Sequence, residues 1–222
     1  MKFPLGENFV INVHKEGEKF IFIFAFVTFV LFFINPVLCT IGVFATAFCI
    51  AFFRDPEKII PKDANVVVAP GDGKVTKVAI VEAPAELKHL AGLEMIKVSI
   101  FLSVFDIHVN RIPVGGKIVE TVYSAGKFLN AASEKSSLDN ERNGIVIQRE
   151  NGDKIGCVQI AGLIARRIVS EAKEGDEYEI GQRYGIIRFG SRMDIYLPTS
   201  YLATVAEGQT TIGGETVIAK IR

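Results

Sequence analysis

The chain has 222 residues, and its 25 basic side chains balance 25 acidic ones, so that the formal net charge is zero. This balance gives no sign of the basic surface by which proteins bind nucleic acids. Three cysteines without a CxxC motif and only three histidines argue against a disulfide framework and a multi-histidine metal site. We therefore expect no nucleic-acid partner and no bound metal.

A long apolar segment, residues 20–53, lies between Lys19 and Arg54 and carries no charge. Asn35-Pro36 divides it into two arms, and this pair favours a turn and breaks helices. Each arm is somewhat shorter than the roughly 20 residues that cross a bilayer. The sequence therefore predicts a transmembrane helical hairpin that spans with some mismatch or inserts as a re-entrant wedge. A single kinked span and a buried pair of soluble helices are the alternatives.

Basic residues flank this segment on both sides: Lys2, Lys15, Lys19, Arg54, Lys58 and Lys62. Because basic flanks stay on the cytoplasmic side of a membrane, both ends of the hairpin are predicted there. The chain then divides into a cytoplasmic segment, residues 1–19, the membrane hairpin, residues 20–53, and a domain of residues 54–222. The expected location is the cell membrane, with this domain on its cytoplasmic side.

The domain after the hairpin consists of short runs of β-branched residues separated by glycine, such as NVVVAP, MIKVSIFL and KIGCVQIAG. This pattern predicts a mostly β (α+β) fold, a compact sandwich or barrel-like domain with lipoyl-like strand motifs. Asn151-Gly152 predicts a tight hairpin between two strands. The best helical pattern lies in residues 83–94, where Leu87 and Leu90 share a face. Residues 127–143 are polar and lack a strand period, which predicts a functional or disordered loop.

The Gly190-Ser191 pair lies between two strand-like runs in YGIIRFGSRMDIYLP. At such a turn a serine hydroxyl can attack the preceding carbonyl, and glycine offers little steric hindrance. If the serine then loses its hydroxyl by elimination, the new chain end becomes a pyruvoyl group, which is a built-in carbonyl cofactor. Gly-Ser is also a common turn pair, so the pair alone does not establish this chemistry.

Two further segments supply the residues that an activated hydroxyl requires. PGDGKV places Asp72 between two glycines, and DIHVNRIP places His108 at a strand end. The histidine would accept the proton of Ser191, and the acid would fix the histidine tautomer. Asp106 is the rival acid, because residues two apart on a strand point to the same face. The alternatives are an ordinary turn residue at Asp72 and a satisfied polar residue in a sheet at His108.

Five motifs occur in the order FFRDPEK, APGDGKV, FLSVFDIHVNRIP, AGLIARRI and GIIRFGSRMDIYLP. In this order, and after an apolar hairpin, they resemble the phosphatidylserine decarboxylases, more narrowly their short bacterial and archaeal form, whose archaeal members act on archaetidylserine. The resemblance covers the chain from about residue 53 to the C-terminus. It implies decarboxylation of the serine headgroup of a membrane phospholipid to the ethanolamine lipid.

The resemblance also implies a maturation step. The proenzyme would cut itself between Gly190 and Ser191 into a larger chain, residues 1–190, and a smaller one, residues 191–222, with Ser191 converted to pyruvoyl. The two chains would stay together as a heterodimer, and family members often dimerise further. The carbonyl would act as the electron sink for decarboxylation, which is the task of pyridoxal phosphate elsewhere.

The chain departs from the longer relatives at one position. They carry two histidines in an H-x-x-H-x-P arrangement, whereas here His108 is followed by Arg111 at the second position. One histidine would then serve both self-cleavage and proton transfer during decarboxylation, or water or the acidic partner would cover one of these steps.

The candidate contacts to the lipid phosphate and the substrate carboxylate are Arg111, Asn140, Arg142 and Arg192. Guanidinium groups bind such anions well. Asn140 and Arg142 belong to the polar loop, whose charge and length suit a segment that closes over a headgroup.

Two alternative functions stay open from the sequence alone. An uncleaved lipoyl-like membrane adaptor would not need Ser191. A membrane-bound serine hydrolase would keep its free hydroxyl and usually carries a G-x-S-x-G motif, which is absent around Ser191. The intact mass of the denatured protein separates them, because two fragments indicate the pyruvoyl enzyme and one uncut chain indicates an alternative.

Overall fold

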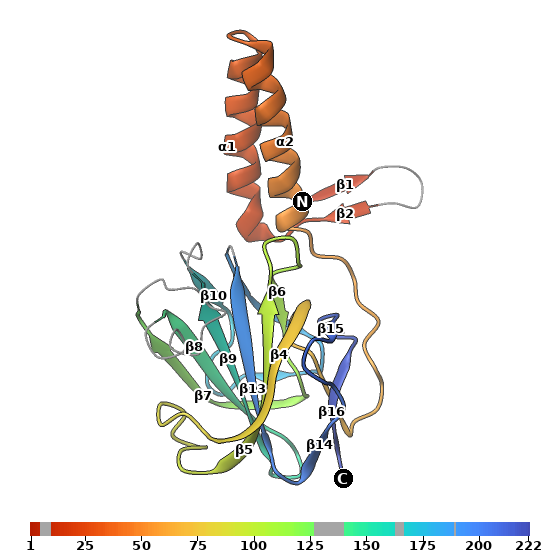
Figure 1. Cartoon of the computed structure of the whole chain (residues 1–222), viewed down its shortest axis with the longest axis vertical. Coiled ribbons are helices and arrows are strands. Elements are labelled where there is room, and N and C mark those ends of the chain that lie inside the picture. Colours follow the sequence, from red (N-terminus) through yellow and green to blue (C-terminus); the bar gives the residue numbers. More distant parts are fainter. Residues whose placement is uncertain (5–9, 127–139, 163–166, 189) are drawn as a thin grey trace. The chain divides into compact units, whose positions relative to one another are not determined.

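The computed structural model describes residues 1–4, 10–126, 140–162, 167–188 and 190–222 (Figure 1). The chain divides into two compact units, Met1–Glu57 and Lys58–Arg222. The first unit holds both helices of the described chain, and the second is built from strands. Most of the predicted loop, residues 127–139, lies outside the described residues. The prediction was wrong at its end, because Arg142 and the residue after it begin a strand, β8 (Arg142–Gln148), that pairs with residues 123 and 124.

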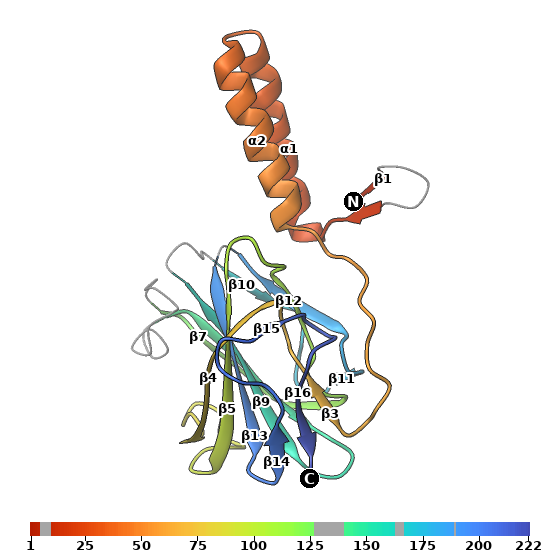
Figure 2. The ribbon, with the colours of Figure 1, turned by 45° about the vertical axis from the view of Figure 1, so that its right-hand side comes forward.

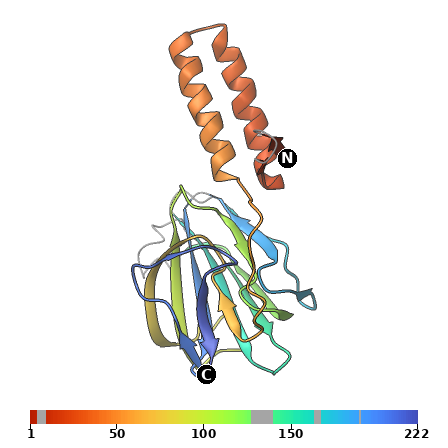
Figure 3. The same ribbon diagram turned by 90° about the vertical axis from the view of Figure 1, so that its right-hand side faces the viewer.

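The first unit contains two helices, α1 (Lys15–Phe32) and α2 (Pro36–Phe52), and two short strands, β1 (Lys2–Pro4) and β2 (Val10–Asn12) (Figure 3). Asn35 caps α2, because its Oδ1 accepts the backbone N–H groups of the second and third residues after it at 2.8 and 3.2 Å. Pro36 begins α2, where its missing N–H needs no partner. The Asn-Pro break therefore lies where the sequence predicts it.

The two helices approach each other closely at Gly42. A Cβ at this position would lie 2.6 Å from Thr28 Oγ1, and the hydroxyls of Thr28 and Thr46 are 3.1 Å apart. Large apolar side chains elsewhere on the hairpin are exposed, including Phe33 at 71% and Phe44 at 72%. Among the described residues no helix combines the length and the apolar character needed to cross a membrane. The hairpin is thus confirmed as a pair of helices, while its predicted transmembrane span is not supported.

The second unit is mostly β, as predicted, and its main element is a curled antiparallel sheet of eight strands (Figure 2). The strand order in this sheet is β11-β7-β8-β9-β13-β5-β4-β15. Two three-stranded sheets, β10-β12-β6 and β14-β16-β3, complete the unit. The strands are β3 (Val66–Val68), β4 (Gly73–Glu82), β5 (Glu94–Leu102), β6 (Val109–Arg111), β7 (Gly116–Ser124), β8 (Arg142–Gln148), β9 (Lys154–Ala161), β10 (Ile168–Ser170), β11 (Glu177–Tyr178), β12 (Arg183–Ile187), β13 (Ser191–Pro198), β14 (Tyr201–Ala203), β15 (Thr210–Thr211) and β16 (Val217–Ile221).

Strand β13 lies in the interior of the large sheet, between β5 and β9, and both of its faces are buried. Its odd-numbered residues Met193, Ile195 and Leu197 join the main apolar core. The opposite face carries Tyr196, which joins a second apolar cluster. Because β13 is buried on both faces, the side chains at its start, Ser191 and Arg192, have almost no contact with water.

The segment before β5 covers this opposite face, but it is not the helix that the sequence predicts. Residues 84–93 form consecutive turns in which Leu87, Leu90 and Leu93 each donate a backbone N–H to the carbonyl three residues earlier. Leu87 and Leu90 are buried against the sheet. A Cβ at Gly156 would come within 2.8 Å of Leu90, so glycine makes room for this packing. The prediction that Leu87 and Leu90 share a face is confirmed, whereas the predicted helix is wrong.

The hairpin predicted at Asn151-Gly152 is confirmed, but its loop has three residues, 150–152, and not the two that were predicted, because the Arg149 N–H still binds the Asp153 carbonyl. It joins β8 and β9, whose last paired residues are Gln148 and Lys154. Gly152 has φ of +87°, a conformation that glycine adopts without strain.

Candidate active site

Ser191 is the first residue of β13 and lies opposite Leu102 of β5 on one side and Ala161 of β9 on the other. Its side chain is completely buried. Within the described part of the chain, Ser191 Oγ has no hydrogen-bond partner. A buried hydroxyl without a partner is unfavourable for stability and is uncommon in native proteins, so it calls for a functional explanation.

Gly190, the residue before Ser191, is held by hydrogen bonds to both of its backbone polar groups. The carbonyl oxygen of Gly190 accepts the backbone N–H of Gly162 at 3.0 Å. The backbone N–H of Gly190 donates to His108 Nε2 at 3.1 Å. Gly190 has φ of +70°, which is unfavourable for any residue with a Cβ. The sequence therefore needs glycine here for its backbone conformation.

His108 is fully buried, and its two ring nitrogens have distinct partners. Nδ1 lies 3.0 Å from the backbone oxygen of Asp106. Because Nε2 accepts an N–H from Gly190, the ring proton must be on Nδ1, which donates it to the Asp106 oxygen. His108 thus presents an unprotonated nitrogen to the backbone N–H of Gly190, and an unprotonated nitrogen is what a general base requires.

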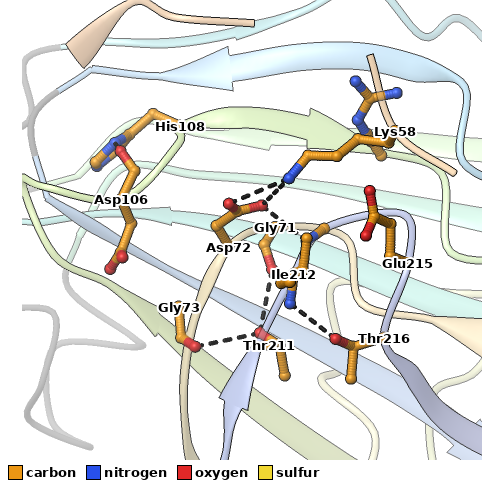
Figure 4. Close-up of polar contacts among 12 residues, drawn as sticks. Lys58, Gly71, Asp72, Gly73, Asp106, His108, Thr211, Ile212, Glu215 and Thr216 are labelled. Atoms are coloured by element: carbon orange, nitrogen blue, oxygen red, sulfur yellow. Dashed lines mark hydrogen bonds and ion pairs between the residues drawn. The ribbon is translucent and has the colours of Figure 1, made fainter. Parts of the chain in front are cut away.

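The two candidate acids make other contacts (Figure 4). The carboxylate of Asp72 lies 3.1 Å from Lys58 Nζ and accepts the backbone N–H of Gly213 at 2.8 Å. The carboxylate of Asp106 accepts the backbone N–H of Ser103 at 2.7 Å. The group that fixes the His108 tautomer is therefore a backbone carbonyl, which sequence reasoning did not consider.

The candidate substrate contacts do not gather in one place. Arg192 Nε and Nη2 bind both oxygens of Asp194 at 2.8 and 2.9 Å. Arg142 Nη2 binds Glu86 at 2.5 Å. Because side chains alternate along a strand, Arg192 points to the face opposite to that of Ser191.

The other two candidates bind backbone carbonyls. Arg111 Nη1 donates to the oxygen of Gly181 at 3.0 Å, and Asn140 Nδ2 donates to the oxygen of Ala161 at 2.7 Å. Asn140 thus binds the residue that lies directly opposite Ser191, because Ala161 is its cross-strand partner.

Sequence reasoning missed two features of the site. One is the N–H of Gly162, which a side-chain motif cannot reveal. The other is a group of buried amide side chains, Asn110, Asn143 and Gln159, on β6, β8 and β9, of which β9 pairs with β13. Gln159 has a signal in the sequence, because it interrupts the apolar run of β9.

Two further observations concern the thiol of Cys157 and possible metal ligands. Cys157 lies in the main apolar core, and burial raises the pKa of its thiol to about 12, so it stays protonated. No three His, Cys, Asp or Glu side chains group together as metal ligands in the described residues.

Comparison with known proteins is consistent with this geometry. A sequence model of the family described as "Phosphatidylserine decarboxylase" matches residues 45–219. The chain is also 51% identical over 207 residues to proteins named "Phosphatidylserine decarboxylase proenzyme" from Rickettsia bellii (strain OSU 85-389), Rickettsia akari (strain Hartford) and Rickettsia prowazekii (strain Madrid E). Each alignment covers 93% of this chain and 89% of the relative.

Proposed function

The chain belongs to the phosphatidylserine decarboxylase family, and from this membership we propose how its own residues perform the family's reaction. It is a decarboxylase that is made as a proenzyme and acts on phosphatidylserine. Decarboxylation converts the serine headgroup into ethanolamine. One observation carries the assignment of residues: the buried Ser191 hydroxyl follows a carbonyl that the Gly162 N–H already binds.

The surroundings of Ser191 fit a pyruvoyl group. Its Oγ is buried without a partner in the described chain, so the elimination that forms the group removes an unfavourable hydroxyl. A pyruvoyl carbonyl at this position would supply an electron sink for the pair of electrons left when carbon dioxide departs. Strands β5 and β9 on either side would keep it out of water.

The maturation begins when Ser191 Oγ attacks the carbonyl carbon of Gly190 and gives its proton to His108. Negative charge develops on the carbonyl oxygen, where the Gly162 N–H stabilises it. The C–N bond then breaks, the Ser191 amine takes up a proton, and an ester joins the two residues. Loss of the Ser191 Cα proton and breakage of its Cβ–O bond release the Gly190 carboxylate. Water finally hydrolyses the dehydroalanine end, which releases ammonia and leaves the pyruvoyl group.

His108 is the proton carrier in this scheme. In the uncut chain, the Nε2 atom of His108 accepts the Gly190 N–H. When this hydrogen bond breaks, Nε2 becomes available to take the proton of the Ser191 hydroxyl. After the cut it would deliver a proton to the headgroup carbon that has lost carbon dioxide, which covers both steps with one histidine. Asp72 would support the protonated ring by its negative charge, while the Asp106 carbonyl orients it.

The two chains produced by the cut would form a heterodimer. The smaller chain, residues 191–222, contains β13, β15 and β16, and each of them pairs with a strand of the larger chain, residues 1–190. Lys97 of the larger chain also lies 3.5 Å from the buried Asp194 of the smaller one. These contacts do not involve the bond that is cut, so they support association after cleavage.

The helical hairpin would hold the enzyme at the membrane of its lipid substrate, with the β unit on the cytoplasmic side. Exposed phenylalanines on both helices support this proposal, because each would gain roughly 1.5–3 kcal/mol on leaving water. Basic residues on both flanks support the cytoplasmic side. Insertion as a re-entrant wedge suits helices of this length.

Replacing Ser191 tests the nucleophile. Ser191→Ala removes the only group proposed to attack the Gly190 carbonyl, so the protein should stay full length and lack decarboxylase activity. Intact mass under denaturing conditions and release of carbon dioxide from phosphatidylserine are the measurements. Efficient cleavage of this variant at Gly190 would exclude the mechanism.

Replacing the histidine and the acids tests the base. His108→Ala should slow self-cleavage by about 10²–10⁴-fold, the usual contribution of a general base. Asp72→Asn should slow it less, and Asp106→Asn should leave it near the parent rate because the backbone carbonyl is retained. The rate of fragment appearance in freshly synthesised protein measures all three. Normal maturation of His108→Ala would assign the base elsewhere.

Replacing Gly162 tests the backbone donor. Gly162→Pro deletes the N–H that binds the Gly190 carbonyl and should slow cleavage by about 10²–10³-fold, as loss of an oxyanion-hole donor does. The preceding residue, Ala161, is in a strand, which is the conformation that a following proline requires. Gly162→Ala keeps the N–H and serves as the control. Equal cleavage rates for the proline and alanine variants would remove this donor from the mechanism.

Charged residues on the hairpin test the membrane role. Phe33→Glu combined with Phe44→Glu should weaken binding to phosphatidylcholine vesicles by at least about tenfold, because two apolar side chains no longer favour insertion. Self-cleavage should not change. Thr199→Glu combined with Ser200→Glu adds the same charge to exposed positions of the β unit and should bind vesicles like the parent. Unchanged sedimentation of the phenylalanine variant with vesicles would contradict the proposal.

A further inference from the structure

Three amide side chains form a buried hydrogen-bonded chain beside the cleavage site. Asn143 Nδ2 donates to Gln159 Oε1 at 2.9 Å, and Gln159 Nε2 donates to Asn110 Oδ1 at 2.8 Å. Gln159 and Asn110 are completely buried, and Asn143 is 8% exposed. The three residues come from β8, β9 and β6, so the chain crosses from the large sheet to a smaller one.

The chain of amides ends in a donor. Asn110 Oδ1 accepts the hydrogen bond from Gln159, so the Nδ2 of Asn110 is the remaining polar atom of the amide chain. This Nδ2 has no hydrogen-bond partner in the described residues. An amide N–H that is buried and unpaired is unfavourable, and its neighbours in the chain hold it in place. Such a donor is preorganised for an oxygen that is not part of the uncut protein.

This donor faces the residues of the cleavage site. Asn110 follows His108 by two residues, and side chains two apart in an extended segment point to the same side. A Cβ at Gly71 would lie 3.7 Å from Asn110 Nδ2 and 3.1 Å from Leu102, the residue opposite Ser191. Asn110 Nδ2 and the side chain of Leu102 therefore both lie beside the backbone of Gly71, which puts the amide near the cross-strand partner of Ser191.

The chemistry of the reaction indicates which oxygen the donor would bind. The serine headgroup carries a carboxylate that the ethanolamine product lacks. A neutral amide orients a carboxylate without cancelling its charge, which suits a group that must leave as uncharged carbon dioxide. A guanidinium would instead stabilise the carboxylate before the reaction, and the nearby Arg192 is already bound to Asp194 on the opposite face.

We propose that Asn110 Nδ2 binds and positions the carboxylate of the serine headgroup in the matured enzyme. Gln159 and Asn143 hold the Asn110 amide in the orientation that this contact requires. The proposal rests on the proposed function and adds the residue by which the enzyme distinguishes its substrate from its product. Binding of the product should accordingly not depend on this amide.

Two substitutions at Asn110 test the proposal in the full-length protein. Asn110→Asp keeps an oxygen for Gln159 Nε2 to bind but places a negative charge where the donor was. Asn110→Ala removes the donor together with the oxygen that Gln159 binds. Both should cut themselves like the parent. Both should raise KM for detergent-dispersed phosphatidylserine by about tenfold or more, the usual effect of losing a hydrogen bond to a charged group. The inhibition constant of phosphatidylethanolamine should stay within about twofold of the parent.

Ser99→Ala is the matched control, because it removes another buried polar atom that has no partner in the described chain. Ser99 lies on the face of β5 opposite to that of Leu102, the cross-strand partner of Ser191. It should leave both constants unchanged.

Three outcomes would overturn the proposal. Parallel changes of the phosphatidylserine KM and the phosphatidylethanolamine inhibition constant in the Asn110 variants would indicate a merely structural role. No change in either constant would also overturn the proposal. Folded Asn110 variants that fail to cut would also overturn it, since the amide would then serve maturation. Failure of the parent itself to cut or decarboxylate would instead refute the proposed function.

Discussion

The hydrogen bonds on the two sides of Gly190 are the constraint on which the site depends. The N–H of this residue is bound by His108 and its carbonyl by Gly162, while its left-handed backbone joins the preceding segment to β13. A residue held at both backbone groups has a fixed orientation relative to the Ser191 hydroxyl that follows it. Changes in either strand neighbour of β13 would alter that orientation, so the start of an interior strand suits the cleavage that we propose better than an exposed loop would.

Burial has two opposite effects in this protein. It excludes water from Ser191 and His108, which strengthens the electrostatic interactions of a developing oxyanion. It also makes unsatisfied polar atoms unfavourable, and both Ser191 Oγ and Asn110 Nδ2 belong to this class within the described residues. The chain thus tolerates locally unfavourable groups at the two positions where we propose chemistry, and the apolar cores on both faces of β13 compensate for them.

The sequence was sufficient to predict features with a local cause. The Asn-Pro break, the Asn-Gly hairpin and the alternating strands follow from the preferences of neighbouring residues, and the family follows from the order of its motifs. The predicted helix over residues 83–94 was wrong because two leucines on one face are equally well placed by successive turns. The sequence could not predict contacts between residues that are distant along the chain. His108 and Gly190 are 82 residues apart, and Asp72 contacts residues 58 and 213. The roles of Asp72 and of the arginines remain predictions for the same reason, since charge and motif do not define a side chain's partner.

The interior position of β13 has a thermodynamic consequence. The precursor folds as one molecule, because the strand that carries Ser191 is tethered to its neighbours. If the bond before it is cut as we propose, unfolding would yield two separate chains, and forming the sheet again would become a second-order reaction between them. The matured protein would then have a stability that depends on its own concentration, and its lifetime would be governed by the rate at which β13 leaves the sheet rather than by an equilibrium.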